Sequence, residues 1–220
     1  MTFTLEYFQG HGRAAQIRLL LEFCKTDYKD SRVDMQEFAK NKAAGKYTHG
    51  QVPVLFMEDG SQLCQTWSIM RYLAKAHKGP NGEVLYPSND NPDLIYFIDS
   101  RLSIDGDLLS KYNQFLLPFL PSYKNKDELF TNFIISDYPA YLEQFEEALT
   151  KNGGPYLSGS NINLADFSAC GFFFKLVVNE QYEHYLILTA ILSKYPKTKA
   201  YVEKMCGIFA DWRNKNQLPM

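Results

Sequence analysis

The chain has 220 residues, which is enough for one large domain or two small ones with a buried core. Its 23 basic and 25 acidic side chains leave a formal net charge of −2, so composition carries no electrostatic signature of binding to nucleic acid or to an anionic membrane. The 16 Phe and 15 Tyr instead favour a thick aromatic core, aromatic-lined pockets, or both.

Short strands and helices alternate at the start of the chain. Residues 3–8 are rich in β-forming side chains and predict a strand. Residues 13–25 place apolar side chains on one helical face, which predicts an amphipathic helix. Residues 30–33 predict a weak strand and residues 35–42 a short helix.

A hairpin and a helix complete this first unit. Residues 54–57 and 62–64 predict two strands, and Asp59-Gly60 between them is a strong turn signal. Residues 66–77 follow as a second amphipathic helix. The order β-α-β-α-β-β-α therefore predicts an α/β domain over residues 1–78, with a central sheet of mixed pairing covered by helices.

The remainder predicts a linker and then helices only. Gly, Pro and Asn are frequent over residues 79–91, which is typical of a domain linker. Residues 92–220 show no strand alternation and predict an all-α domain, in which Asn163 and Asp166 have the spacing of a helix capping box. The apolar helix expected at residues 167–178 would be the buried centre of this domain. Prolines interrupt the helical pattern at Pro118, Pro121, Pro139 and Pro155.

The four cysteines, Cys24, Cys64, Cys170 and Cys206, are scattered and form no CxxC pair. We interpret them as reduced, buried thiols. The first residues lack the basic and apolar regions of a secretory signal, and no run is long enough to span a bilayer. These features predict a cytoplasmic protein with no membrane span. The four histidines show no spacing of a metal site, so no metal is expected.

Two segments together suggest a site for a small acidic peptide. A strand that opens with proline loses a ladder donor, and the Val52-Pro53 bond could be cis and shape a tight turn. Such a turn would leave the Val52 backbone free to pair with an extended peptide. The helix start at Gln65-Thr66 offers free amide donors to a carboxylate. The simpler interpretations are an edge-strand proline and an ordinary helix cap.

Two residues near the start could carry chemistry. Tyr7 ends the first strand before a glycine-containing loop, where a phenol could donate a hydrogen bond to a sulfur and favour its thiolate. A core tyrosine is the simpler interpretation. Arg13 stands at a helix start, where a cation opposes the helix dipole, so it either has a ligand or is a surface arginine.

In their order along the chain, these segments resemble the tyrosine-type classes of the cytosolic glutathione transferases, leaning towards sigma or pi. The resemblance covers essentially the whole chain, including its length, linker position and β-then-α division. It is carried by Tyr7-Phe8-x-x-x-Gly12-Arg13-Ala14, Gln51-Val52-Pro53-Val54-Leu55, Asp59-Gly60, Gln65-Thr66 and Asn163-x-x-Asp166.

The resemblance implies a thioredoxin-like N-terminal domain, an all-helical C-terminal domain and a homodimer. It implies glutathione as the bound peptide and as a co-substrate, with no cofactor. Tyr7 would stabilise the thiolate and Arg13 would support that environment. The Val52 main chain, held by a cis bond to Pro53, would pair with the cysteinyl backbone of glutathione.

Other contacts to glutathione follow from the same resemblance. Gln65 and Thr66 would bind the γ-glutamyl carboxylate at a helix N-terminus. Gln51 would contact the backbone or the glycyl end. Members of the family commonly have tryptophan where this chain has Phe38. Lys42 matches the lysine that contacts the glycyl carboxylate in the family, and Lys46 is the alternative.

The family also takes an acid from the partner subunit for the γ-glutamyl amine. Asp107 is the best match, and Asp105 is the alternative. The acceptor pocket would lie between the domains, where Phe8 is the expected wall. Further candidates for this pocket, on the helix after Asp107, are Asn113, Phe115 and Leu117.

The resemblance implies a detoxifying transferase that conjugates glutathione to hydrophobic electrophiles. Two alternatives stay open: a glutathione-dependent isomerase of the prostaglandin D synthase type, and a non-catalytic carrier or structural protein. A cysteine-based redox role is disfavoured, because the loop from Tyr7 to Arg13 contains no cysteine.

Overall fold

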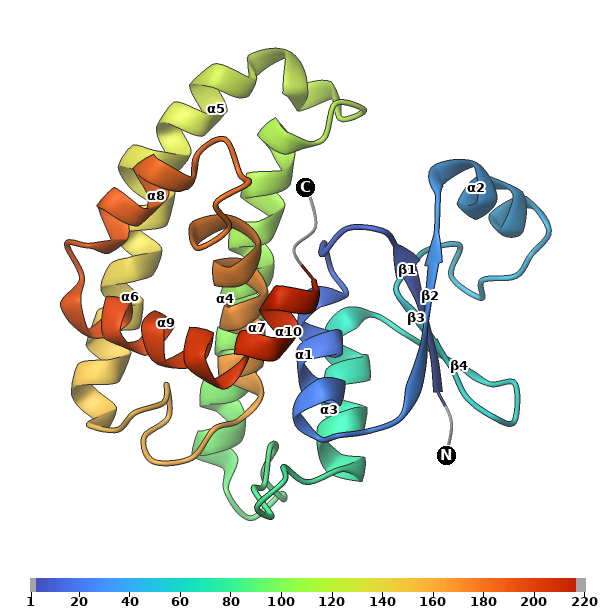
Figure 1. Cartoon of the computed structure of the whole chain (residues 1–220), viewed down its shortest axis with the longest axis horizontal. Coiled ribbons are helices and arrows are strands. Elements are labelled where there is room, and N and C mark those ends of the chain that lie inside the picture. The colour runs from blue at the N-terminus through green and yellow to red at the C-terminus, as the bar shows by residue number, and fades with distance from the viewer. Residues whose placement is uncertain (1–2, 217–220) are drawn as a thin grey trace.

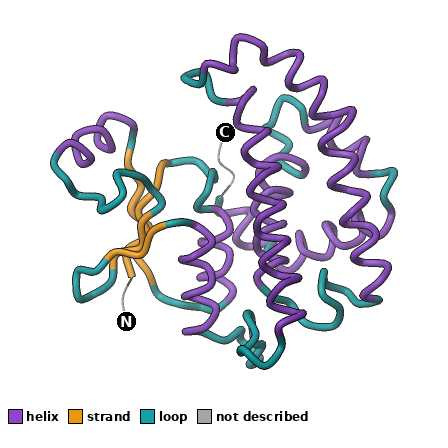
Figure 2. The backbone as a smooth tube through the Cα atoms, turned by 180° about the vertical axis from the view of Figure 1, so that it is seen from behind, coloured by secondary structure: helices purple, strands orange, loops and turns teal. Residues whose placement is uncertain are grey.

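The computed structural model describes residues 3–216, which form a small sheet with helices followed by a larger helical part (Figures 1 and 2). The sheet has the strand order β2-β1-β3-β4. Strand β1 (Phe3–Phe8) pairs parallel to β2 (Tyr28–Val33) and antiparallel to β3 (Val54–Phe56). Strand β4 (Gln62–Cys64) closes the antiparallel hairpin with β3, so the pairing is mixed as the sequence predicts.

The helices of this first part lie on two sides of the sheet. Figure 1 shows α1 (Ala15–Phe23) and α3 (Thr66–Ala76) between the sheet and the helical part, whereas α2 (Met35–Ala43) lies on the far side. Every residue of α1 from Ala15 to Leu21 is buried, but α2 buries none. Helix α1 is shorter than the predicted span of residues 13–25, since Lys25 adopts a φ of 50° just after it.

The helical part begins at Pro92, whose fixed φ suits the first turn of the long helix α4 (Pro92–Leu116). The helix ends before Pro118, which cannot continue it. The later elements are a 3₁₀ helix (Pro121–Asn125), α5 (Lys126–Asn132), a π-helix (Phe133–Asp137), α6 (Tyr138–Asn152), α7 (Leu164–Phe172), a second π-helix (Phe173–Val177), α8 (Tyr185–Leu192), α9 (Pro196–Ile208) and α10 (Ala210–Lys215).

Helix α7 is the buried centre of this part, as expected, although it begins at Leu164 and its continuation is π-helical. The predicted capping pair is present: Asn163 Oδ1 accepts from the Ala165 amide at 3.0 Å, and Asp166 Oδ2 accepts from the Asn163 amide at 2.9 Å. Asp166 Oδ1 also accepts from the hydroxyl of Tyr201 at 3.0 Å. Burial nevertheless raises the pKa of Asp166 to about 6.

One continuous hydrophobic core joins the sheet part to the helical part. Helix α1 packs on α7, and the Phe23 and Phe167 rings meet edge to face with centroids 5.2 Å apart. This packing fixes the groove between the two parts and therefore the geometry of any site within it. Among residues 3–216, no helix has the length and apolar character needed to cross a bilayer.

Candidate functional site

A pocket of about 670 Å³ lies between the sheet part and the segment that follows α4. Its lining comes from the end of β1 and the loop before α1, from α2, and from the loop before β3. The end of β4, the start of α3 and the segment after α4 complete it. Most of the residues that the sequence singles out meet here. The lining consists of Tyr7, Phe8, Arg13, Met35, Phe38, Lys42, His49, Gly50, Gln51, Val52, Pro53, Cys64, Gln65, Thr66, Leu117 and Phe119.

The Tyr7 hydroxyl is the central polar group of this pocket. Tyr7 is 9% exposed, and its oxygen accepts a hydrogen bond from the Arg13 amide at 3.0 Å. The Arg18 guanidinium lies 6.0 Å from the centre of the Tyr7 ring. One lone pair of the phenol oxygen is thus engaged by the backbone, which leaves the O–H free to donate into the pocket.

The electrostatic environment keeps this phenol protonated. Burial raises the pKa of Tyr7, while the Arg13 amide and the charges of Arg13 and Arg18 act in the opposite direction. A neutral phenol can donate a hydrogen bond to an anion, and nearby positive charge makes it a stronger hydrogen-bond donor. The group is therefore suited to stabilise a negatively charged sulfur or oxygen beside it.

The loop between β1 and α1 is anchored to α3 as well as to Tyr7. The Thr66 hydroxyl donates to the Arg13 carbonyl at 3.1 Å, so the amide and the carbonyl of Arg13 are both held. Thr66 is buried, but the Arg13 side chain is exposed at the pocket. The backbone of Arg13 is thus fixed while its guanidinium is available to a ligand.

The N-terminus of α3 opens into the same pocket without a side-chain cap. Gln65 occupies the cap position with a φ of 69°, and its side chain accepts no hydrogen bond from the first turn of the helix. The helix has no acidic residue in that turn. Free amides and the positive end of the helix dipole therefore face the pocket, which favours an anion. The backbone strain at Gln65 is of the kind that proteins retain at functional sites.

The segment before β3 offers main-chain groups to an extended ligand. The Val52–Pro53 peptide bond is cis, which is the isomer that the sequence allows for. Pro53 is buried and Val52 is half-buried, while Gln51 is exposed at the rim. Within residues 3–216, no backbone hydrogen bond outside the helices and strands involves Val52. Its amide and carbonyl are free to pair with a peptide.

Helix α2 contributes an aromatic wall and a cation. The Phe38 ring stacks on Tyr47, with centroids 5.5 Å apart, and meets Phe8 edge to face at 5.2 Å. Lys42 Nζ lies 5.9 Å from the centre of the Phe38 ring. Lys42 has no ion pair among the described residues, and its exposed ammonium lines the pocket.

Lys46, the alternative candidate for the glycyl carboxylate, is paired with a carboxylate of the protein itself. Its Nζ forms an ion pair of 2.8 Å with the buried Glu6 carboxylate, which also accepts from the Tyr47 and Ser31 hydroxyls. Burial alone would raise the pKa of Glu6, but the hydrogen bonds from Lys46, Tyr47 and Ser31 hold that pKa below its ordinary value. The structure therefore favours Lys42 as the pocket's free ammonium.

The apolar side of the pocket includes Phe8 and Leu117, together with two residues that the sequence analysis did not select. Met35 is 59% exposed and Phe119 is 69% exposed, and both line the opening. Exposure of such large apolar side chains at one cleft is characteristic of a binding surface. Periodicity could not find Phe119, because it lies outside a regular helix.

Two other predicted acceptor residues are placed differently. Phe115 is buried within α4, where its ring packs against Phe130 at 5.6 Å and Phe133 at 5.3 Å. Asn113 is half-buried on the same helix, and neither side chain lines the pocket.

The two candidate acids on α4 differ in exposure. Asp107 is exposed, but Asp105 is 3% exposed and accepts a hydrogen bond from the Tyr141 hydroxyl at 2.9 Å. Its carboxylate also lies 3.5 Å from the Arg101 guanidinium, and burial raises the pKa of Asp105. Only Asp107 of this pair can reach a second molecule.

Cys64 and His49 also line the pocket, although no sequence motif points to either residue. Burial raises the pKa of the Cys64 thiol, so its neutral form is favoured. No group of three or more His, Cys, Asp or Glu side chains within residues 3–216 could hold a metal ion.

Comparison with known families gives a consistent result for both parts. Residues 3–75 match the family model of the glutathione S-transferase N-terminal domain, and residues 107–208 match that of the C-terminal domain. Glutathione S-transferase P of Caenorhabditis elegans is 31% identical over 224 residues, covering 94% of this chain and 95% of that protein.

Two further similarities extend this comparison. S-crystallin SL11 of Nototodarus sloanii is 26% identical over 92% of this chain and 96% of its own length. Prostaglandin synthase D of Nilaparvata lugens has the same fold, with a TM-score of 0.78, 24% identity and full coverage of both chains.

Proposed function

The chain belongs to the glutathione S-transferase family, and on this basis we propose that it joins the sulfur of glutathione to hydrophobic electrophiles. The observation that carries the proposal is the Tyr7 hydroxyl, which is held by the Arg13 amide at 3.0 Å inside a pocket with a peptide-binding edge and an apolar wall. Glutathione would be a co-substrate, and no cofactor would be required. We place the enzyme in the cytoplasm, with a role in detoxification.

The peptide-binding edge would hold glutathione at both ends. The γ-glutamyl carboxylate would accept hydrogen bonds from the open N-terminus of α3, at Gln65 and Thr66. The cysteinyl backbone would pair with the unpaired Val52 main chain beside cis-Pro53. Lys42 would bind the glycyl carboxylate, and the exposed Gln51 would contact the same end.

This arrangement would place the cysteinyl sulfur beside Tyr7. A free thiol has a pKa near ~8.5, so only a small fraction is thiolate at neutral pH. A pKa lower by about 2 units corresponds to about 2.7 kcal/mol of preferential stabilisation of the thiolate. A hydrogen bond from a neutral phenol, with the positive charge of Arg13 nearby, can supply energy of this order.

The thiolate would then attack an electrophilic carbon of the acceptor. A carbon–sulfur bond forms, and the electron pair leaves with a departing group or is protonated at the neighbouring carbon. Phe8, Leu117, Met35 and Phe119 would bury the apolar body of the acceptor next to the sulfur. Holding both reactants in one pocket lowers the entropic part of the barrier.

The site would be completed by a second copy of the chain. In a homodimer, Asp107 of the partner subunit would bind the γ-glutamyl amine. The exposure of Asp107 supports this assignment, whereas Asp105 is buried against Arg101 and Tyr141.

A conjugation assay over several electrophiles, with wild type and Tyr7→Phe in parallel, tests the function. We expect the wild type to be active and Tyr7→Phe to lose about 10-fold to 100-fold in kcat, because it loses a donor to the thiolate. The KM for glutathione should change little, since the peptide contacts remain. Equal rates for both proteins would refute the role of Tyr7.

Two other outcomes address the alternatives. Binding of glutathione without turnover of any electrophile would favour the carrier or structural role, and turnover of an endoperoxide alone would favour the isomerase. Gel filtration tests the dimer, and a monomer with full activity would exclude the role of Asp107 from the partner subunit.

A further inference from the structure

The loop of residues 9–14 controls the proposed chemistry, because its Arg13 amide is the group that holds the Tyr7 hydroxyl. The loop forms neither a strand nor a complete helix, so it depends on contacts from other elements to keep its shape. The Thr66 hydroxyl is one such contact, at the Arg13 carbonyl.

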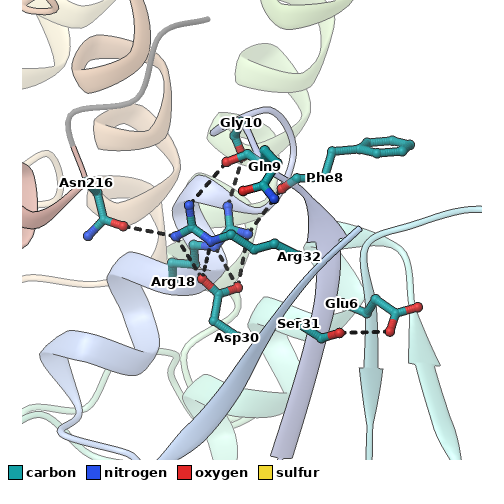
Figure 3. A network of polar contacts seen from close by, with 9 residues as sticks. All are labelled: Glu6, Phe8, Gln9, Gly10, Arg18, Asp30, Ser31, Arg32 and Asn216. Atoms are coloured by element: carbon teal, nitrogen blue, oxygen red, sulfur yellow. Dashed lines mark hydrogen bonds and ion pairs between the residues drawn. The ribbon is translucent and has the colours of Figure 1, made fainter. Parts of the chain in front are cut away.

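Two arginines from separate elements hold the carbonyl groups at the start of this loop (Figure 3). Arg18 Nη1, on α1, donates to the Gly10 carbonyl at 3.0 Å. Arg32 Nη1, on β2, donates to the Gln9 carbonyl at 3.2 Å. The position of the loop therefore depends on how firmly the two guanidinium groups are themselves held.

Asp30 holds both arginines at once. Its Oδ1 accepts from Arg18 Nε and Nη2, both at 3.1 Å, and its Oδ2 accepts from Arg32 Nε at 2.8 Å. The Arg18 side chain is 1% exposed, but that of Arg32 is 23% exposed. Arg32 is thus the less enclosed of the two, and a further contact restrains it.

That restraint comes from the other end of the chain. Asn216 Oδ1 accepts from Arg32 Nη2 at 3.1 Å, and Asn216 Nδ2 donates to the Trp212 carbonyl at 2.8 Å. The His11 ring, within the loop, is buried and packs against the Trp212 ring of α10 with centroids 5.6 Å apart. The end of α10 therefore touches the loop both directly, at His11, and through Arg32.

We propose that the Arg32–Asn216 contact is a C-terminal latch that positions the loop of residues 9–14 and thereby the Tyr7–Arg13 hydrogen bond. Asn216 is in this sense a positioning residue, which acts on the reaction through Arg32 and does not touch the substrate. The helical part would set the reactivity of the sulfur held by the sheet part. This inference rests on the proposed function for its catalytic readout.

Three variants of the C-terminal segment test the latch. Asn216→Ala removes the acceptor for Arg32, and Asn216→Asp keeps it. Asn214→Ala changes an exposed neighbour that forms no hydrogen bond with Arg18 or Arg32. We expect Asn216→Ala to lower kcat by about threefold to tenfold, with an unchanged KM for glutathione. This is less than the full effect of one lost hydrogen bond to a charged group, because Asn216 acts on the sulfur only through Arg32 and the loop. The pKa of the bound thiol should rise, whereas Asn216→Asp and Asn214→Ala should match wild type.

A double-mutant cycle identifies the route of the effect. Arg32→Met removes the guanidinium, so Asn216→Ala should have no additional effect on kcat in that background. Independent effects of the two substitutions would overturn the latch. Equal impairment of Asn216→Ala and Asn216→Asp would also overturn it, because the Trp212 contact would then be responsible.

Amide hydrogen exchange provides a readout that does not depend on catalysis. The Arg13 amide should exchange faster in Asn216→Ala than in Asn214→Ala if the latch holds the loop. Equal exchange in the two variants would overturn the latch whatever the enzyme does. A wild-type complex in which bound glutathione titrates like the free thiol would instead overturn the proposed function.

Discussion

The Tyr7 hydroxyl accepts a hydrogen bond of 3.0 Å from the Arg13 amide, and the same phenol occupies the space that a side chain on Gly12 would need. Gly12 has a φ of 42°, and a Cβ added there would overlap the hydroxyl and lie 2.7 Å from Cε1 of the ring. The loop can pass this close to Tyr7 only because residue 12 has no side chain.

We therefore expect Gly12→Ala to displace the phenol while leaving most of the fold intact. The pKa of bound glutathione should rise towards its free value, and kcat should fall by about 10-fold or more, because one well-placed donor to the thiolate is lost. The thiolate absorbance of the binary complex, titrated with pH, measures this shift. Gly10→Ala is the control, since an added Cβ there has no atom within 4 Å. Equal behaviour of the two variants would contradict the assignment.

We expect substitution of Lys42 to weaken glutathione binding and substitution of Lys46 to lower the stability of the fold. Lys42→Ala should raise the KM for glutathione by about tenfold, because a free ammonium that binds a carboxylate is removed. Lys46→Ala should leave KM unchanged and lower the free energy of unfolding by about 1 kcal/mol, since Lys46 is partly exposed and its pair with Glu6 is screened. Steady-state kinetics and chemical denaturation measure the two effects. A larger change in KM for Lys46→Ala than for Lys42→Ala would reverse the assignment.

Of the two acids on α4, we expect Asp107 to affect glutathione binding and Asp105 to affect the stability of the fold. Asp107→Ala should weaken glutathione binding several-fold in calorimetry, with a change in unfolding free energy within about 0.5 kcal/mol, as for an exposed site. Asp105→Ala should cost about 3–5 kcal/mol of unfolding free energy, because it leaves the buried Arg101 charge unpaired. Glutathione affinity that is unaltered in Asp107→Ala would remove this residue from the site.

His11 should make stability depend on pH. Burial, with the charges of Arg18, Lys175 and Arg32, lowers the pKa of His11 to about 4. The unfolded state therefore binds more protons than the folded state between pH 6.5 and about 4, and stability is lost as the pH falls through this window.

The comparison of wild type with His11→Gln isolates this contribution, since the other titrating groups are common to both proteins. The unfolding free energy of the wild type minus that of His11→Gln should fall by about 3 kcal/mol between pH 7 and pH 4, because only the wild type loses the contribution of His11. A difference that stays constant with pH would mean that His11 is solvated or already charged.

Local sequence accounts for the elements and for the edge of the site at which we propose that glutathione binds. Strand β1 and the β3–β4 hairpin follow from β-forming side chains and the Asp59-Gly60 turn, and the α7 start follows from Asn163 and Asp166. Val52-Pro53 and Gln65-Thr66 act through their own backbone, so short motifs are sufficient to predict where they lie.

Packing between distant segments sets which of these side chains are available to a ligand. Lys42 and Lys46, or Asp105 and Asp107, are equivalent in a local pattern, and only long-range partners such as Glu6 and Tyr141 distinguish them.

The contact of Arg32 with Asn216 joins residues 184 positions apart, and no local periodicity encodes it. Burial of Phe115 likewise depends on α5 and the π-helix packing over α4. The physical reason is that exposure, pairing and the shape of the pocket are properties of how the two parts dock, whereas strand, helix and turn are fixed by neighbours along the chain.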